Sequence, residues 1–313
     1  NYWMSPETTS VNRLPMLNIE HFEQISLDGT WRFQLLHKPT EKLGKRWAPI
    51  PVPGLWTMQE PSDVFFDKPI YTNVQMPFPE QPPFVPEENP TGVYERDFDL
   101  PKSWSGKRIV LQLGGYESVA LIYINGAEVG LTKDSRLAAE FDITQFVRSG
   151  NNIVRIDVTK WSDATFIEDQ DQWWHGGITR SVKLYATNKV FIERFKTVAG
   201  LEKDGTTGTL TIDADLGSLD NLSTDGYTLR ASITELPKVK SAQLSHTIKN
   251  FTSPIWTERD ASLKKRSDDY FHGKYWHGNL PADAKAAIME NEPWPHGKVQ
   301  IQTRIPKVNP WSA

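Results

Sequence analysis

Alternation of apolar and polar residues along short segments is the feature that most constrains this chain. The stretch from Asn152 to Val158 alternates, as do Thr30 to Leu35, Val93 to Phe98 and Ser181 to Tyr185, while Arg108 to Leu113 and Val119 to Ile124 are mostly apolar segments. A period of two places successive side chains on opposite faces of a strand. Because Gly, Asn and Pro separate these segments, the sequence predicts an all-β sandwich.

Local turn signals refine this prediction at two places. Asn125-Gly126 stands between two apolar segments, and a type I′ hairpin turn needs residues that tolerate positive φ at both central positions. We therefore expect a hairpin there. The segment from Asp142 to Arg148 predicts a short helical turn, with Asp142 or Thr144 as its cap.

A proline-rich loop of about forty residues, between Pro51 and Gly92, interrupts the strand pattern; a loop this long in a compact domain is usually functional or disordered. Its aromatic residues favour a packed, ordered loop: Trp56, Phe65, Phe66, Tyr71, Phe78 and Phe84. Proline also lowers the entropic cost of holding one conformation.

A second set of strands follows Thr187: Val190 to Val198, Gly208 to Leu216, Tyr227 to Thr234 and Lys298 to Ile305. Their spacing is typical of an immunoglobulin-like sandwich. The pattern decays between Leu236 and His296, so no fold is assigned there. The predicted domains are a jelly-roll β-sandwich over residues 1–188 and an incomplete immunoglobulin-like β-sandwich over residues 189–313, with an unassigned insertion at about 237–296.

Composition excludes several classes of protein. The 313 residues include no cysteine, which removes disulfides, thiolate nucleophiles and Cys-ligated metals and favours the cytoplasm. A net charge of −4 argues against a nucleic-acid binder, which normally carries a basic excess. No apolar run approaches the ~20 residues of a membrane-spanning helix. The start has no secretory signal and no initiator methionine at position 1, so we expect that preceding residues have been lost.

Common catalytic signatures are also missing from the sequence. There is no phosphate-binding loop, dinucleotide fingerprint, zinc-binding His-Glu-x-x-His or Gly-x-Ser-x-Gly elbow. His272 and His277 follow two aspartates, and a polar, aromatic surface segment is the preferred interpretation over a metal cluster. The 12 tryptophans favour thick β cores or flat apolar faces for ligands such as sugars.

Several ordered motifs together resemble one protein family. They are Ser26-Leu27-Asp28-Gly29-Thr30-Trp31-Arg32-Phe33, Val52-Pro53-Gly54-Leu55-Trp56, Pro69-Ile70-Tyr71-Thr72-Asn73-Val74, the run from Pro82 to Gly92, Asp134-Ser135-Arg136-Leu137, and Trp161 to Trp173 closing with Gly177-Ile178-Thr179-Arg180. Over about residues 10–195 the chain resembles the N-terminal sugar-binding domain of bacterial lactase-type β-galactosidases in glycoside hydrolase family 2. The tail from Asn309 to Ala313 resembles a segment late in the family's second domain.

The resemblance implies that catalysis belongs to another part of the protein. In this family a (β/α)8 barrel follows the two sandwiches and carries two catalytic Glu residues of a retaining glycosidase, with carboxyl groups ~5 Å apart. The barrel also carries the magnesium ligands, so we expect no catalytic residue in this chain. Glu292, in Asn291-Glu292-Pro293, resembles an acid/base motif but stands outside any barrel strand, which argues against catalysis.

The resemblance also implies a binding role for two residues. Asp171, the second Asp of Glu168-Asp169-Gln170-Asp171, would bind sodium and help to hold the galactosyl hydroxyls. A hard cation favours carboxylate and carbonyl oxygens, which fits this residue. Gln81 stands where the family has an Asn before Pro-Pro-Phe-Val-Pro, and would reach the sugar with a longer side chain. Trp173, Trp174 and His175 are candidates for an apolar wall near Asp171.

Three functional hypotheses remain open from the sequence. The chain is the N-terminal portion of a β-galactosidase, a stand-alone lectin-like module, or a fragment of a β-glucuronidase or β-mannosidase relative; the Pro-Pro-Phe-Val-Pro loop and Asp-Gln-Asp argue against the third. The first hypothesis implies β-galactosides, the protein's own barrel and a second copy in a homo-oligomer as partners. It implies no membrane or nucleic acid. DNA that continues past Ala313 would separate the first two hypotheses.

Overall fold

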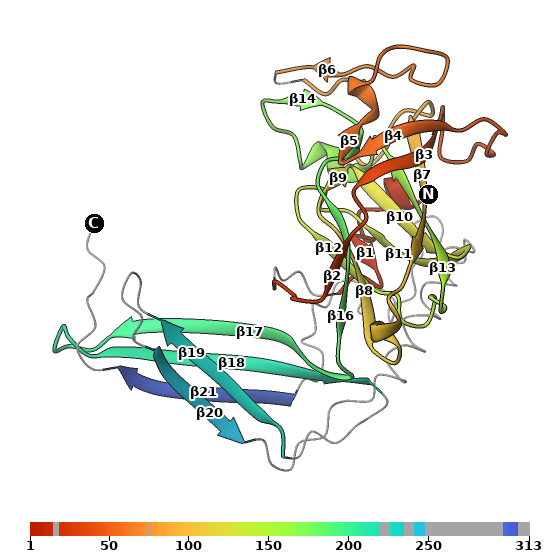
Figure 1. Ribbon diagram of the computed structural model, residues 1–313. Helices are drawn as coiled ribbons and strands as arrows, with labels where there is room; N and C mark the ends of the chain where they lie inside the picture. Colours follow the sequence, from red (N-terminus) through yellow and green to blue (C-terminus); the bar gives the residue numbers. More distant parts are fainter. Residues whose placement is uncertain (15–18, 74, 220–225, 235–240, 248–296, 306–313) are drawn as a thin grey trace. The chain divides into compact units, whose positions relative to one another are not determined.

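The computed structural model describes residues 1–14, 19–73, 75–219, 226–234, 241–247 and 297–305. These residues fall into two compact units, one within Asn1–Thr187 and the other beginning at Asn188 (Figure 1). Apart from Ser241–Thr247, the unassigned stretch at 237–296 lies outside the described residues, as do His272, His277, Glu292 and the Asn309–Ala313 tail.

The first unit is a sandwich of two antiparallel sheets, of the jelly-roll type that the sequence predicts. The larger sheet has seven strands in the order β1 (Ser10–Val11), β11 (Ala127–Thr132), β10 (Val119–Ile124), β13 (Asn151–Thr159), β7 (Thr91–Asp99), β3 (Gly29–Leu36) and β4 (Ala48–Val52). The smaller sheet has four, in the order β12 (Ala139–Asp142), β8 (Arg108–Leu113), β16 (Val182–Thr187) and β2 (Gln24–Ser26).

The core lies between these two sheets, because each strand turns its alternate apolar side chains inward. The larger sheet contributes Trp31, Phe33, Tyr94, Ile122 and Ile156, and the smaller contributes Leu111, Leu113, Phe141 and Leu184. Each fully buried side chain of this kind stabilises the fold by about 1.5–3 kcal/mol. The predicted strands of the first half are therefore confirmed.

The structure contains both of the predicted turns. Asn125 and Gly126 have φ values of 52° and 82°, so the predicted hairpin connects β10 to β11. The short helical turn predicted after Asp142 is confirmed as a single turn, in which the backbone N–H groups of Phe146 and Val147 both donate to the Ile143 carbonyl oxygen, at 2.9 and 3.2 Å. Asp142 caps this turn, because its Oδ1 accepts a hydrogen bond of 3.0 Å from the Thr144 backbone N–H. The helical elements of this unit are 3₁₀ turns that the periodicity did not indicate: η1 (Tyr2–Met4), η2 (Trp56–Met58), η3 (Lys102–Trp104) and η4 (Asp163–Phe166).

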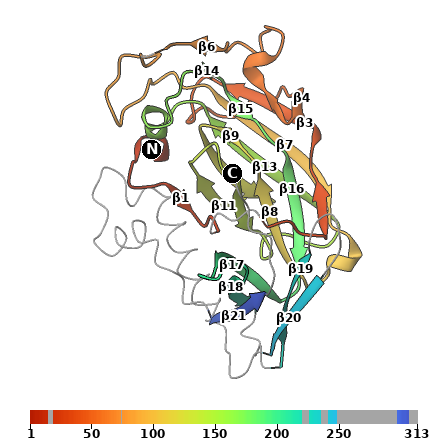
Figure 2. The ribbon, with the colours of Figure 1, turned by 90° about the vertical axis from the view of Figure 1, so that its left-hand side faces the viewer.

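Short strands at one end of the sandwich organise the loops. β15 (Gly177–Ile178) pairs with β5 (Gly54–Leu55) and with β9 (Tyr116–Glu117), and β14 (Trp173–Trp174) pairs with β6 (Ile70–Tyr71). Figures 1 and 2 both place β6 and β14 side by side at the same end. The proline-rich loop thus meets the segment that carries Asp171.

The second unit is a smaller antiparallel β structure. β17 (Val190–Leu201), β18 (Gly208–Ser218) and β21 (Gly297–Ile305) form one sheet, while β19 (Thr228–Thr234) pairs with β20 (Ser241–Thr247). Ala214, Leu216, Leu229 and Ile301 come from both sheets and form its core. The strand β20 lies in the stretch to which the sequence assigned no fold. Together the units confirm the all-β class, and the described residues include no helix that could cross a membrane.

Candidate sugar-binding site

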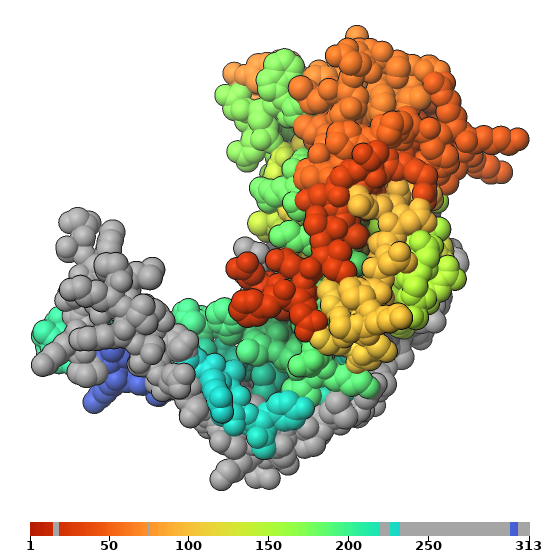
Figure 3. Space-filling view, in the orientation of Figure 1, coloured from red at the N-terminus to blue at the C-terminus, as the bar shows by residue number. Residues whose placement is uncertain are grey.

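The candidate site lies on a two-stranded ribbon, β6 and β14, at the loop end of the first unit. In this ribbon Tyr71 pairs with Trp173, and Ile70 pairs with Trp174. β6 belongs to the proline-rich loop, and β14 directly follows Asp171. In the space-filling view the orange atoms of the loop adjoin the green atoms of the later segment at this end (Figure 3). The pairing therefore joins the two segments that the resemblance singled out.

Asp171 is exposed and is oriented by Tyr71. The Tyr71 hydroxyl donates a hydrogen bond of 2.8 Å to Asp171 Oδ1. This hydrogen bond, together with the negative charge of the carboxylate, raises the pKa of Tyr71 above its ordinary 10.0. Since a carboxylate offers about four lone-pair sites, one donated bond leaves room for a ligand. Asp171 is thus an available acceptor in a fixed orientation.

Trp173 lies beside Tyr71, and its strand neighbour Trp174 faces the opposite way. The rings of Tyr71 and Trp173 have centroids 5.6 Å apart and are tilted by 41°. Trp174 is buried, and its Nε1–H donates to Thr72 Oγ1 at 2.7 Å. Its ring also meets Trp161 edge to face at 5.7 Å. The interpretation of Trp174 as part of a binding wall is therefore wrong; because its apolar ring packs in the interior, it anchors the ribbon.

A buried ion pair fixes the other strand of the ribbon. The Lys160 ammonium, which is fully enclosed, donates to both carboxylate oxygens of Asp67 at 2.9 Å. Trp56 Nε1–H donates to the same carboxylate at 2.8 Å. Burial lowers the pKa of Lys160, while the Asp67 carboxylate opposes that shift. Asp67 precedes β6 by only a few residues, so the ion pair ties the loop to the end of β13.

Trp56 itself needs two glycines as neighbours. A Cβ at Gly176 would lie 2.1 Å from the Trp56 ring, and one at Gly92 would lie 2.7 Å from it. Side chains at those positions would displace the indole that holds Asp67. The absence of a side chain at each position is thus required by the packing.

His175 directly follows β14 and is half-buried. Its Nδ1 lies 3.0 Å from Thr57 Oγ1. Burial lowers the pKa of His175, and the positive charges of Lys160 and Arg136 lower it further. His175 therefore contributes a neutral, hydrogen-bonded side chain at physiological pH rather than a cation.

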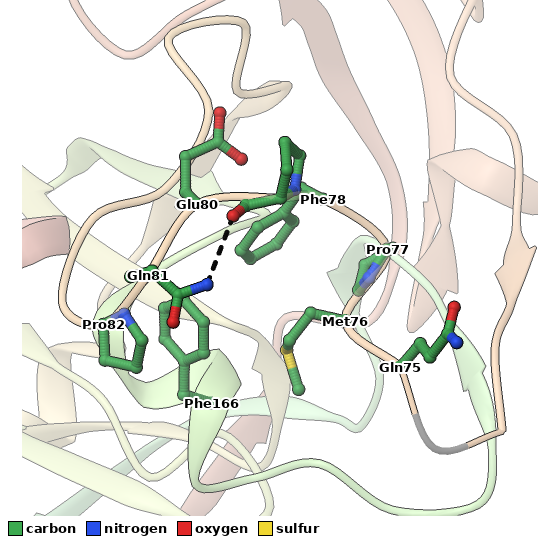
Figure 4. A pocket seen from close by; sticks show the side chains of 9 residues that line it. Gln75, Met76, Pro77, Phe78, Glu80, Gln81, Pro82 and Phe166 are labelled. Carbon is green, nitrogen blue, oxygen red and sulfur yellow. Dashed lines mark hydrogen bonds between the residues drawn. The ribbon is translucent and has the colours of Figure 1, made fainter.

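Gln81 belongs to a different part of the proline-rich loop. It lines a pocket of about 610 Å³ together with Gln75, Met76, Pro77, Phe78, Pro79, Glu80, Pro82 and Phe166 (Figure 4). The amide Nε2 of Gln81 donates to the Pro79 carbonyl oxygen at 3.4 Å, which is a long hydrogen bond. Asp171 is not among the residues that line this pocket. The structure therefore gives the two predicted binding residues separate surroundings.

Glu168 and Asp169, the two acidic residues before Asp171, are half-buried. Glu168 accepts hydrogen bonds from the backbone N–H and the hydroxyl of Ser135, at 2.9 and 2.5 Å. The Oδ1 atom of Asp169 is buried and has no hydrogen-bond partner among the described residues. Of the acidic residues in this motif, Asp171 is the one that is exposed on the ribbon.

The oxygen chemistry of Asp171 fits a hard monovalent cation such as sodium. Within the described part of the chain, no three His, Asp or Glu side chains gather as a metal site. A cation bound here would complete its coordination with carbonyl oxygens, water or sugar hydroxyls. Asp171 would therefore supply one ligand of such a site and not a complete cage.

Comparison with known proteins identifies the family. The sequence model of one protein family, described as the sugar-binding domain of glycosyl hydrolases family 2, matches residues 24–188, more than half of the chain. This chain belongs to glycosyl hydrolase family 2. β6, β14, Asp171 and Gln81 all lie inside its family 2 sugar-binding domain.

Curated relatives of this family 2 chain are β-galactosidases. Those from Vibrio cholerae and Kluyveromyces lactis are 43% identical over 179 and 192 residues, covering 54% and 58% of this chain and 17% and 18% of their own length. One from Yersinia pestis is 37% identical over 226 residues, which cover 67% of this chain and 21% of the relative. The family 2 chain thus spans about a fifth of the length of these relatives.

Solved structures show the same fold at low identity. A β-glucuronidase from Bacteroides uniformis has a TM-score of 0.57 and 17% identity, with coverage of 93% of this chain and 28% of that structure. One from Bifidobacterium dentium has a TM-score of 0.53 and 18% identity, covering 75% of this chain and 41% of that structure. At this identity the likeness establishes the β-sandwich fold of the family 2 chain and nothing finer.

Two residues of the candidate site received no role from the sequence. Tyr71 stands in the Pro-Ile-Tyr-Thr-Asn motif, so its position was marked, but its contact with Asp171 spans a sequence separation of 100. Lys160 follows the predicted strand that ends at Val158, and a single lysine there gives no signal of burial. Pairing of the two loops was the missing information in both cases.

Proposed function

We propose that this chain is the sugar-binding part of a retaining β-galactosidase that hydrolyses terminal β-D-galactosides such as lactose. The curated β-galactosidases that are 37–43% identical to it support this proposal. The catalytic Glu pair and the magnesium ligands would belong to the barrel of the longer enzyme. That enzyme would be a cytoplasmic homo-oligomer in which this domain completes the galactose pocket.

The observation that carries the proposal is the exposed Asp171 carboxylate with its orienting Tyr71 hydroxyl. A galactosyl unit presents several hydroxyl donors, and a fixed carboxylate accepts hydrogen bonds from such donors strongly. Asp171 would hold a sodium ion and share it with the sugar hydroxyls. Gln81 would add an amide contact from the rim of the proline-rich loop after release of its long bond to Pro79.

The test compares two acidic residues of one loop in the longer enzyme. Asp171→Asn keeps the shape and removes the charge, so kcat/KM should fall about 10- to 150-fold and lose its sodium dependence. Asp169→Asn serves as the matched control and should have a much smaller effect. Full sodium-dependent activity in both variants, or greater sensitivity at Asp169, would contradict this assignment of the site.

A further inference from the structure

Two large aromatic side chains of the ribbon are exposed side by side. Tyr71 is 48% exposed and Trp173 is 54% exposed, although they form a cross-strand pair with ring centroids 5.6 Å apart. Ile70 on the same ribbon is 37% exposed. Adjoining exposed apolar side chains rimmed by polar groups are a common feature of ligand and partner sites. This surface, Tyr71 with Trp173, is called the aromatic platform below.

The aromatic platform is held rigidly from behind. Under β14, the buried Trp174 is fixed by its hydrogen bond to Thr72 and by its contact with Trp161. Before β6, the Lys160–Asp67 ion pair holds the loop. A rigid aromatic surface loses little conformational entropy when a ligand binds, which makes it suited to recognition.

The charge beside the platform indicates the class of ligand. Asp171 supplies an acceptor at the edge of the two rings, through its bond with Tyr71. A pyranose ring combines an apolar face of C–H groups with hydroxyl donors around its edge. Apolar walls with a few well-placed polar groups are the usual composition of a small-molecule site. The proposed function makes this sugar a galacto-configured one, whose axial 4-hydroxyl leaves the C–H groups at positions 3, 4 and 5 on one face.

We propose that Tyr71 and Trp173 form a stacking platform for the C–H face of a galacto-configured pyranose, with Asp171 accepting hydrogen bonds from its hydroxyls. This inference rests on the proposed function, because it names how the same domain would select galactose. It assigns to Trp173 a direct contact with the sugar and to Tyr71 a double role, as a stacking surface and as the donor that orients Asp171.

The experiment measures saturation transfer from the protein to methyl β-D-galactoside by NMR, with a titration for the dissociation constant. With the unchanged chain, transfer should be strongest at the hydrogens on carbons 3, 4 and 5. Trp173→Ala should weaken binding about three- to tenfold and remove this pattern, and Trp173→Phe should restore much of it. Phe22→Ala, which changes a fully exposed aromatic residue outside the ribbon, should leave the dissociation constant and the transfer pattern unchanged.

The outcomes separate this inference from the proposed function. If Asp171→Asn weakens galactoside binding but Trp173→Ala does not, the platform is wrong and the proposed function stands. If Trp173→Ala weakens binding while Asp171→Asn changes neither affinity nor the response to sodium, the proposed role of Asp171 fails and the platform stands. Failure of the chain to bind the galactoside at all would contradict both. Retained dispersion of the NMR spectrum shows that each variant is folded.

Discussion

At the scale of single residues, the site depends on one contact between distant parts of the sequence. The motif around Asp171 predicted a binding role for its carboxylate, which stays a prediction, and the structure places that carboxylate on the surface. Its partner Tyr71 could not be predicted, because no local pattern links residues that meet only through strand pairing. Trp173 and Trp174 show a second limit of the sequence. They are identical neighbours, and only the fold decides that Trp174 is the buried one.

The Tyr71–Asp171 contact predicts a pH effect on the tyrosine. The carboxylate stabilises the protonated phenol, so the pKa of Tyr71 lies above 10.0. Asp171→Asn should therefore lower the pKa of Tyr71 toward 10.0, as measured by NMR titration of isotope-labelled tyrosine. Asp169→Asn should leave it in place. An unchanged Tyr71 titration in Asp171→Asn would show that the contact does not exist in solution.

His175 predicts a pH dependence of stability. Because its pKa is lowered below 6.5 in the folded chain, the unfolded chain takes up the proton first as the pH falls. The contribution of His175 is therefore intact above 6.5 and lost progressively as the pH falls below it. Denaturant unfolding at about pH 8 and about pH 5.5 should show a smaller pH-dependent loss of unfolding free energy in His175→Gln than in the unchanged chain. Equal losses would count against this assignment.

At the scale of secondary-structure elements, long strands were predictable and short ones were not. β13 was visible as a period-2 segment and β8 as a β-branched, apolar one, and the hairpin at Asn125-Gly126 was set by local turn chemistry. β6 and β14 have two residues each, too few for any period to appear. Their pairing depends on the buried Trp174 and on the Lys160–Asp67 ion pair. These contacts join residues far apart in the sequence, so no local pattern reveals them.

The Lys160–Asp67 ion pair should be essential for the element that carries Tyr71. Lys160→Met leaves the Asp67 carboxylate buried without its cation, and breaking such a pair costs about 3–5 kcal/mol of unfolding free energy. Lys38→Met removes an exposed ion pair with Glu87, on the same loop, and should change stability little. Thermal or denaturant unfolding of both variants measures the difference, and equal effects would contradict the proposed anchoring.

At the scale of the whole molecule, the chain combines a family 2 sugar-binding domain with a second β unit. The two-sheet sandwich provides a rigid base, and loops at one end provide the candidate chemistry. The resemblance of ordered motifs predicted this family correctly. Galactose selectivity does not follow from the fold, because β-glucuronidase structures share it.

We predict that this chain alone does not hydrolyse a chromogenic β-galactoside. The matched region is the sugar-binding domain, and the family resemblance assigns both catalytic carboxylates to the barrel. A sensitive turnover assay on purified chain, with the longer enzyme as the positive control, measures this. Turnover that disappears when one of this chain's own Glu residues is changed would overturn the assignment.

Galactose binding by the chain itself is the most direct measurement of the central claim, that this domain recognises a galactosyl unit through Asp171. Calorimetric or NMR titration with galactose should give a dissociation constant in the millimolar range or weaker, about −4 kcal/mol or less favourable, because the domain supplies only part of a pocket. Binding should strengthen with sodium in the unchanged chain and lose that response in Asp171→Asn. A micromolar constant would favour a stand-alone lectin, and equal or tighter binding of glucuronate, or a sodium response that survives Asp171→Asn, would contradict the claim.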